Sequence, residues 1–207
     1  MSSTTMMSST TAKRSTSSTT TTTTPIVQMR IELIGIDPPI WRRILCPSET
    51  TLDEFHVIVQ RAMGWSNCHL HRFEIRDRDI GNADYLEDER KFSLKDVAVN
   101  EHFVYEYDFG DSWEHDVHIE KEVPRDANAS YPVCVAGQRK CPPEDCGGIR
   151  RYEYILGAHA DGTLDADTKE WIREGTGGEP FNPEQFDLAT VNEELRKPAR
   201  RERRRFM

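Results

Sequence analysis

Apolar and polar residues alternate along several short segments of the chain, which is the pattern of strands with one buried face. In residues 26–36, for example, Met29, Ile31 and Leu33 share one face of an extended chain. Prolines at 38–39 and at 47 break the pattern, because proline has no backbone N–H to donate to a sheet. The strands predicted in this way cover residues 26–36, 40–46, 70–75, 102–108 and 112–122.

A helical period begins at Thr51. Thr51 and Glu54 fit the capping box, in which each side chain satisfies a backbone N–H of the other residue, and Gly64 is a stop signal. Between them the apolar residues form one helical stripe, made of Leu52, Phe55, Ile58, Val59 and Ala62. The polar segment 77–90 is predicted to form turns. A short helical turn is predicted at 93–97, and further helices at 150–160, 165–174 and 187–196.

These elements predict a single α+β domain over residues 26–196, with a mostly antiparallel sheet, one long helix packed on it, and C-terminal helices. A chain of 207 residues is long enough to bury one such core. Residues 1–25 are almost all serine and threonine, and only Lys13 and Arg14 are basic there. We therefore expect a disordered tail in that segment rather than an organelle transit peptide.

Charge separates the body of the chain from its ends. The whole chain carries −9, while residues 1–25 carry +2 and residues 197–207 carry +5, so residues 26–196 carry −16. An acidic body repels phosphates, so nucleic acid could bind only through the basic tail from Lys197 to Arg205. That tail could instead contact an acidic partner or the body of its own domain, act as a nuclear import signal in a eukaryotic source, or stay solvated.

The chain has no apolar run long enough to span a membrane and no apolar segment typical of a secretory signal. We therefore expect no membrane partner and a cytoplasmic location. An odd number of cysteines without a secretion signal predicts reduced thiols rather than a disulfide framework. The five cysteines are Cys46, Cys68, Cys134, Cys141 and Cys146.

Residues 105–119 are the most informative stretch, because they predict two strands joined by a tight turn at 109–111. About twenty residues later comes the Cys-Pro-Pro-Glu-Asp-Cys-Gly-Gly loop at 141–148. The two prolines fix φ angles, and the two glycines permit positive ones. The loop is either a rigid connector or a functional loop that holds Glu144 and Asp145 in place.

Asp108 and Asp111 flank Gly110 at the hairpin turn. Aspartate beside glycine is ordinary turn chemistry. A carboxylate pair can also act as acid and base or bind a divalent cation, and Glu144 and Asp145 could converge on the same place. Both interpretations stay open.

Strand parity places His71 and His115 on apolar faces, and an unpaired buried imidazole is costly. Each ring could bond a backbone carbonyl or one of the turn aspartates. Alternatively, they join Cys141 and Cys146 around zinc, whose preferred ligands are imidazole and thiolate. The spacings Cys134-x6-Cys141 and Cys141-x4-Cys146 weigh against zinc, since they differ from the short knuckle of most structural sites. The candidate pocket therefore contains His71, Asp108, Asp111, Trp113, His115, Glu144 and Asp145.

Several long motifs make the chain resemble the plasmid pRiA4b ORF-3-like family. They are Pro-Pro-Ile-Trp-Arg-Arg at 38–43, Thr-Leu-Asp-Glu-Phe-His at 51–56, Gly64-Trp65 with His-Leu-His-Arg-Phe at 69–73, the hairpin sequence at 105–115, Tyr-Pro-Val-Cys at 131–134, and the loop at 141–148. The resemblance covers about residues 26–196. It implies a single α+β domain of a group found on plasmids, mobile elements and many genomes, with no settled biochemical activity.

Three hypotheses follow. The first is a non-catalytic intracellular module that binds a protein or small ligand between the hairpin turn and the loop at 141–148. The second is a metal-assisted hydrolase that uses His71, His115, Asp108, Asp111, Cys141 and Cys146. The third is a nucleic-acid-associated protein that works through its basic tail. The chain has no G-x-S-x-G elbow, P-loop or G-x-G-x-x-G motif to favour another class.

Overall fold

The computed structural model describes residues 24–175 and 178–198. The predicted tail at 1–25 lies outside this part except for Thr24 and Pro25, and the predicted basic tail lies outside it from Ala199 onward. The expectations for the two tails therefore stay predictions.

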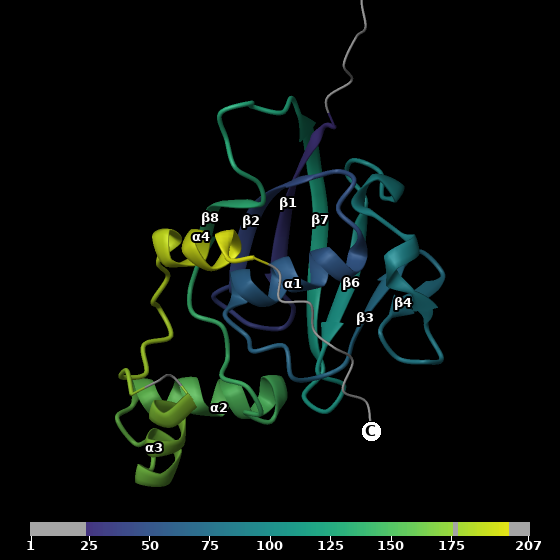
Figure 1. Cartoon of the computed structure of the whole chain (residues 1–207). Helices are drawn as coiled ribbons and strands as arrows, with labels where there is room; N and C mark the ends of the chain where they lie inside the picture. The colour runs from purple at the N-terminus through teal and green to yellow at the C-terminus, as the bar shows by residue number, and fades with distance from the viewer. Residues whose placement is uncertain (1–23, 176–177, 199–207) are drawn as a thin grey trace, which may run out of the picture.

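Within the described residues, eight strands form one sheet in the order β5-β4-β3-β6-β7-β1-β2-β8 (Figure 1). Neighbouring strands are antiparallel except for β4 and β5, which run parallel. The predicted α+β class with a mostly antiparallel sheet is confirmed. The strands are β1 (Ile26–Leu33), β2 (Trp41–Pro47), β3 (His71–Ile75), β4 (Arg78–Gly81), β5 (Glu87–Asp88), β6 (His102–Tyr107), β7 (Trp113–Val123) and β8 (Val133–Gln138).

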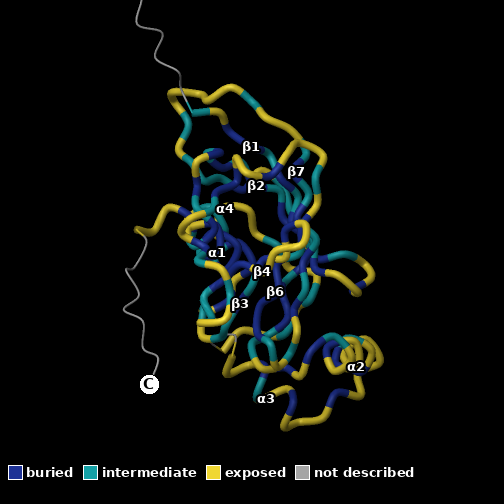
Figure 2. Tube along the Cα trace, turned by 90° about the vertical axis from the view of Figure 1, so that its right-hand side faces the viewer, coloured by how far each residue is buried: buried dark blue, intermediate teal, exposed yellow. Residues whose placement is uncertain are grey.

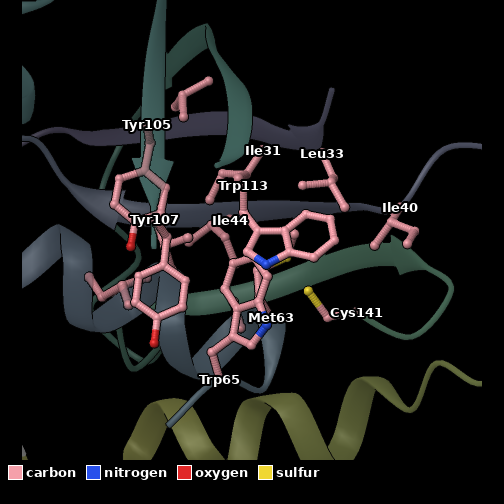
Figure 3. Packing of buried hydrophobic residues seen from close by; sticks show 14 of the residues in the cluster. Ile31, Leu33, Ile40, Ile44, Met63, Trp65, Tyr105, Tyr107, Trp113 and Cys141 are labelled. Atoms are coloured by element: carbon pink, nitrogen blue, oxygen red, sulfur yellow. The ribbon is translucent and has the colours of Figure 1, made fainter. Parts of the chain in front are cut away.

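The inward face of the central strands carries a continuous row of large side chains. Tyr105 of β6 pairs with Phe73 on one side and His115 on the other, and Tyr107 lies between His71 and Trp113. Figure 3 shows the rings of the two tyrosines and Trp113 gathered on the same side of the sheet. Fully burying an apolar side chain of this size contributes about 1.5–3 kcal/mol, so this row makes a large contribution to stability.

Helix α1 (Leu52–Met63) covers this face (Figure 1). Its capping box forms as predicted, and the Thr51 N–H donates to Glu54 Oε2 over 3.2 Å. Phe55 packs against Phe73 and against a second strand phenylalanine, with both pairs of ring centroids 6.1 Å apart. The helix ends at Gly64, which adopts a left-handed φ of 97° and donates to the Gln60 carbonyl.

Turns form within 77–90 as predicted, at residues 82–86, but the segment also contains β4, β5 and a 3₁₀ turn (Glu89–Lys91), which were not predicted. The strands are polar because they lie at the sheet edge, where Arg78 and Glu87 pair across the ladder (2.5–2.8 Å). At the opposite edge lies β8 (Val133–Gln138), which begins inside the Tyr-Pro-Val-Cys motif at 131–134. Its outer side is capped by Asn192, whose amide bonds both the N–H and the carbonyl of Cys134.

Three further helices follow, α2 (Gly148–Ala160), α3 (Ala166–Gly175) and α4 (Leu188–Arg196). Helix α4 lies beside α1, while α2 and α3 lie beyond the end of the sheet near the β6–β7 turn (Figure 1); the tube of Figure 2 shows the same separation and the exposed outer surface of α2. Tyr152 of α2 packs edge-on against Trp113, with ring centroids 6.4 Å apart. No helix among the described residues combines the length and apolar character needed to cross a membrane.

The stop of α1 can be tested with a matched pair of glycines. We expect Gly64→Ala to lower the free energy of unfolding by about 1 kcal/mol, because a side chain is strained at positive φ although nothing crowds it. Gly157→Ala inside α2 also meets open space at ordinary helical φ, and it should raise the free energy of unfolding by about 0.5–1 kcal/mol. Urea denaturation measures both, and equal shifts for the two variants would contradict the expectation.

Candidate metal centre

Three segments meet where the inward row of the sheet ends. They are the stretch after α1 (66–70), the β6–β7 turn (108–112) and the loop at 141–147. Backbone-directed bonds hold them together: Asp108 N–H donates to the Leu70 carbonyl over 2.9 Å, and Gly147 N–H to Asp111 Oδ2 over 2.9 Å. Trp65 completes the contact, because its indole N–H donates to the Pro142 carbonyl over 3.1 Å.

Three carboxylates surround one imidazole nitrogen at this junction. His69 Nε2 lies 3.1 Å from Asp145 Oδ1, 3.7 Å from Asp108 Oδ2 and 3.9 Å from Glu144 Oε2. Two overlapping groups of metal-ligating atoms arise, each with all its atoms within 4.8 Å of one another: His69 with Asp108 and Asp145, and His69 with Cys68 and Glu144. We call these five residues the His69 cluster.

The nitrogen at the middle of the cluster is unsatisfied. His69 Nε2 is shielded from solvent and has no hydrogen-bond partner, although Asp145 lies within ion-pair distance of it. The carboxylates approach it without the direction of a hydrogen bond. A nitrogen lone pair facing several carboxylate oxygens is repelled by them unless a positive charge lies between. The arrangement therefore suits either an N–H on this ring nitrogen or a metal ion beside it.

Glu144 is fixed in place by its neighbours. Its Oε1 accepts the Ser66 N–H over 2.7 Å and the Ser66 hydroxyl over 2.9 Å, and the Tyr107 hydroxyl donates to it over 3.2 Å. Burial raises the pKa of Tyr107, so this phenol stays protonated and can serve as a donor. Oε2 is the carboxylate oxygen of Glu144 that faces His69.

The two aspartates of the cluster differ in setting. Asp108 is nearly enclosed, with 9% of its side chain exposed, and its Oδ1 accepts the Gly110 N–H over 2.9 Å. Asp145 has 69% of its side chain exposed. Both adopt left-handed φ angles, 59° and 55°, which aspartate tolerates better than most residues. The Asp108 side of the cluster is therefore enclosed by the protein, and the Asp145 side is open to solvent.

A closed circuit of buried hydrogen bonds positions the segment that carries the cluster. The Gln60 amide donates to the Tyr105 hydroxyl (3.0 Å), which bonds His56 Nδ1 (2.8 Å). His56 Nε2 bonds Asn67 Oδ1 (2.6 Å), and Asn67 N–H returns to Gln60 Oε1 (3.0 Å). If Nε2 carries the ring proton, every donor in the circuit meets an acceptor. The circuit holds Asn67 in place, and Asn67 is followed directly by Cys68 and His69.

The predicted pocket residues do not all lie together in the structure. Asp108, Glu144 and Asp145 come together, but around His69, which the strand-parity argument did not select. Asp111 lies beside them and bonds Gly147. Trp113 is a fully buried core residue that packs against Trp65 and Tyr152.

The two predicted histidines are buried in the core. His71 stacks on His56 with ring centroids 3.4 Å apart, and its Nε2 lies 2.6 Å from Glu89 Oε2. His115 Nδ1 donates to the Tyr105 carbonyl over 3.2 Å, which is one of the backbone partners considered above. Burial lowers the pKa of His71 to about 3 and that of His115 to about 4.

Cys141 and Cys146 are buried free thiols. Figure 3 shows the Cys141 sulfur beside the ring of Trp113, in hydrophobic surroundings. Burial raises the pKa of both thiols, for Cys146 to about 12, which disfavours the thiolate that zinc requires. Neither ligand group found among the described residues contains these thiols, His71 or His115. The structure therefore does not gather the four predicted zinc ligands.

A pocket of about 290 Å³ adjoins the His69 cluster. Glu144 lines it and also belongs to the cluster, so the two share a wall. Other parts of the wall are Trp65, Lys140 and the prolines at 142–143. Phe181, from a later part of the chain, also lines the pocket. The pocket therefore lies between the end of α1, the loop at 141–147 and the C-terminal segments.

The sequence model of plasmid pRiA4b ORF-3-like proteins matches residues 25–190. The chain belongs to this family. A curated relative, an uncharacterized protein from Sinorhizobium fredii (strain NBRC 101917 / NGR234), is 35% identical over 156 residues, which cover 70% of this chain and 80% of that protein. A crystal structure of a protein of unknown function from Methanosarcina mazei Go1 is 36% identical, covers 81% of this chain and 96% of that one, and superposes with a TM-score of 0.74.

The buried histidines of this family member predict a stability that depends on pH. Burial lowers the pKa of His56 to about 3 and of His115 to about 4, against an ordinary value of 6.5. Below pH 6.5 these histidines become protonated in the unfolded chain but stay neutral in the folded chain. Each of them therefore lowers the free energy of unfolding by about 1.4 kcal/mol per pH unit, until the pH reaches its pKa in the folded state.

Urea denaturation between pH 7.5 and 5, with EDTA present, measures this slope. His115→Leu should make the slope shallower by about 1.4 kcal/mol per pH unit, since an apolar side chain has no proton to gain. A slope identical to that of the unmodified chain would contradict the expectation.

Proposed function

We propose that this protein is a non-catalytic binding module whose ligand is a divalent metal ion, held by the His69 cluster. The observation that carries the proposal is His69 Nε2, shielded from solvent, without a hydrogen bond, and facing three carboxylates. A divalent ion between these atoms would neutralise the carboxylates and give the nitrogen lone pair a partner at the same time.

The spacing of the donors supports a shared ion. Ligands bound at about 2.0–2.2 Å in a tetrahedral arrangement lie about 3.3–3.6 Å from one another. The distances from His69 Nε2 to the three carboxylates, 3.1, 3.7 and 3.9 Å, fall close to that range. Small side-chain rotations would therefore suffice to bind an ion, and the backbone of the three segments need not move.

The surroundings also support a built site. Glu144 is oriented by Ser66 and Tyr107, and the Gln60–Tyr105–His56–Asn67 circuit fixes the preceding segment. Partners of this kind hold ligands in orientation and are worth 10–100-fold in metal affinity. The five free thiols of the described chain are consistent with the reducing intracellular location that we also propose.

Metal-assisted hydrolysis is the second candidate. It is favoured by one observation, the pocket of about 290 Å³ that shares Glu144 with the cluster. A metal ion with an open position lowers the pKa of its bound water, and a pocket beside it could hold a substrate. Metal-dependent turnover of p-nitrophenyl acetate or phosphate that disappears in His69→Ala would favour the enzyme over the binding module. Binding of nucleic acid through Lys197 to Arg205 stays a separate proposal.

Metal binding by purified, EDTA-stripped protein tests the main proposal. Titration calorimetry with Zn²⁺ and with Mn²⁺ should give one ion per chain, and His69→Ala should weaken binding by about 100-fold or more, because a direct ligand is worth at least as much as its supporting partners. Asp145→Asn, at an exposed position, should weaken binding without affecting the fold.

His159→Ala is the matched control, since His159 lies on α2 and contacts Phe181 instead of the cluster. It should bind as the unmodified chain does. If no divalent ion binds to the unmodified chain in the micromolar range, or if His69→Ala binds equally well, the proposal fails.

A further inference from the structure

We infer that the metal is a thiophilic ion, Zn²⁺ in the cell, and that the thiolate of Cys68 is one of its ligands. This inference rests on the proposed function and deepens it by naming the ion and the residue that selects it. It differs from the sequence-based zinc prediction, which placed the ion among His71, His115, Cys141 and Cys146.

Cys68 is the one cysteine of the chain with an exposed side chain; the other four are buried. Its sulfur, His69 nitrogen and a Glu144 oxygen lie within 4.8 Å of one another. Thiolate, imidazole and carboxylate together are a donor set that zinc accepts, with sulfur at about 2.3 Å and nitrogen at about 2.0–2.1 Å. Mg²⁺ and Ca²⁺ prefer oxygen ligands only.

The thiol and Glu144 are oriented by the same two hydroxyl groups. The Ser66 hydroxyl contacts both Cys68 Sγ (3.3 Å) and Glu144 Oε1 (2.9 Å). The Tyr107 hydroxyl lies 3.8 Å from Cys68 Sγ, accepts the Cys68 N–H over 3.1 Å, and donates to Glu144. A thiolate accepts hydrogen bonds from hydroxyl groups, so the Ser66 hydroxyl, which has one proton to donate, can turn it from Glu144 to the charged sulfur.

The two overlapping groups share His69 and differ in the atoms they add. One adds a sulfur and an oxygen, and the other adds two oxygens. An ion that prefers sulfur would bind Cys68 together with His69. An ion that prefers oxygen would bind the two aspartates together with His69. Binding through Cys68 breaks its S–H bond, forms a metal–sulfur bond and releases the proton to solvent, so affinity should fall as the pH falls. Cys68 is therefore the residue that decides which metal is held.

Substitution with Co²⁺ gives a direct readout of sulfur ligation, because a cobalt–thiolate bond produces a charge-transfer band in the near ultraviolet. The full chain, stripped with EDTA under a non-thiol reductant, is titrated with Co²⁺ alone. We expect the band to appear with one equivalent of ion and to be absent in Cys68→Ser. In competition, Cys68→Ser should lose at least about tenfold in Zn²⁺ affinity and leave Mn²⁺ affinity unchanged.

Cys146→Ser is the comparison variant, with circular dichroism as the check of its fold. It should keep the band, and if the band disappears with Cys146 and not with Cys68, the inference is overturned. Metal binding that requires His69 but gives no band, and does not change in Cys68→Ser, overturns this inference and leaves the proposed function standing. Failure of every ion to bind overturns both.

Discussion

The fold depends on burying one face of the antiparallel sheet under α1. That face contains the aromatic row of Phe73, Tyr105, Tyr107 and Trp113, and it excludes water from everything between sheet and helix. Polar groups that share the face must find partners inside the protein, because a buried unpaired group costs about 1–3 kcal/mol. Several buried polar residues meet this requirement through bonds inside the protein, although His71 Nδ1, Trp113 Nε1, His115 Nε2 and the Tyr152 hydroxyl have no hydrogen-bond partner among the described residues.

Arg42 illustrates how the requirement is met. It lies on the inward side of β2 and is almost fully buried, and its guanidinium donates to the carbonyls of Ala62, Trp41 and Gln138. It thereby bonds the last turn of α1, where the helix dipole favours positive charge. The same constraint makes the Gln60–Tyr105–His56–Asn67 circuit close on itself. At the end of the sheet the aromatic cover stops, and there His69 Nε2 is left without such an internal partner.

Much of the fold follows from local pattern. The period of two in β1 and β7, the capping box at Thr51 and the glycine at 64 are local signals, and the structure has the expected elements at these places. The strands at 78–81 and 87–88 could not be predicted in this way. They are short edge strands whose stability comes from pairing with β3 and from the Arg78–Glu87 contact, neither of which leaves an alternating pattern.

The site was harder to predict than the fold, for a geometric reason. Strand parity correctly turns His71 and His115 inward, but an inward position in a packed sheet means burial among aromatic rings, where an imidazole stays neutral and bonds a fixed partner. His69 lies just before β3, at the same parity as His71, but beyond the cover of the aromatic row. The available signal was position: the His-Leu-His sequence straddles the start of a strand, beside a turn rich in aspartate.

Electrostatics distinguishes the cluster from the ion-paired carboxylates of this acidic domain. Several surface carboxylates of this acidic domain pair with an arginine, as Glu101 does with Arg76 and Glu120 with Arg43. Asp108, Glu144 and Asp145 have no such partner among the described residues, and His69 is the one basic group within ion-pair distance of them. One imidazolium would leave two negative charges uncompensated near an enclosed aspartate, whereas a divalent ion leaves at most one. This excess of negative charge around one imidazole is the electrostatic basis of the proposed metal site.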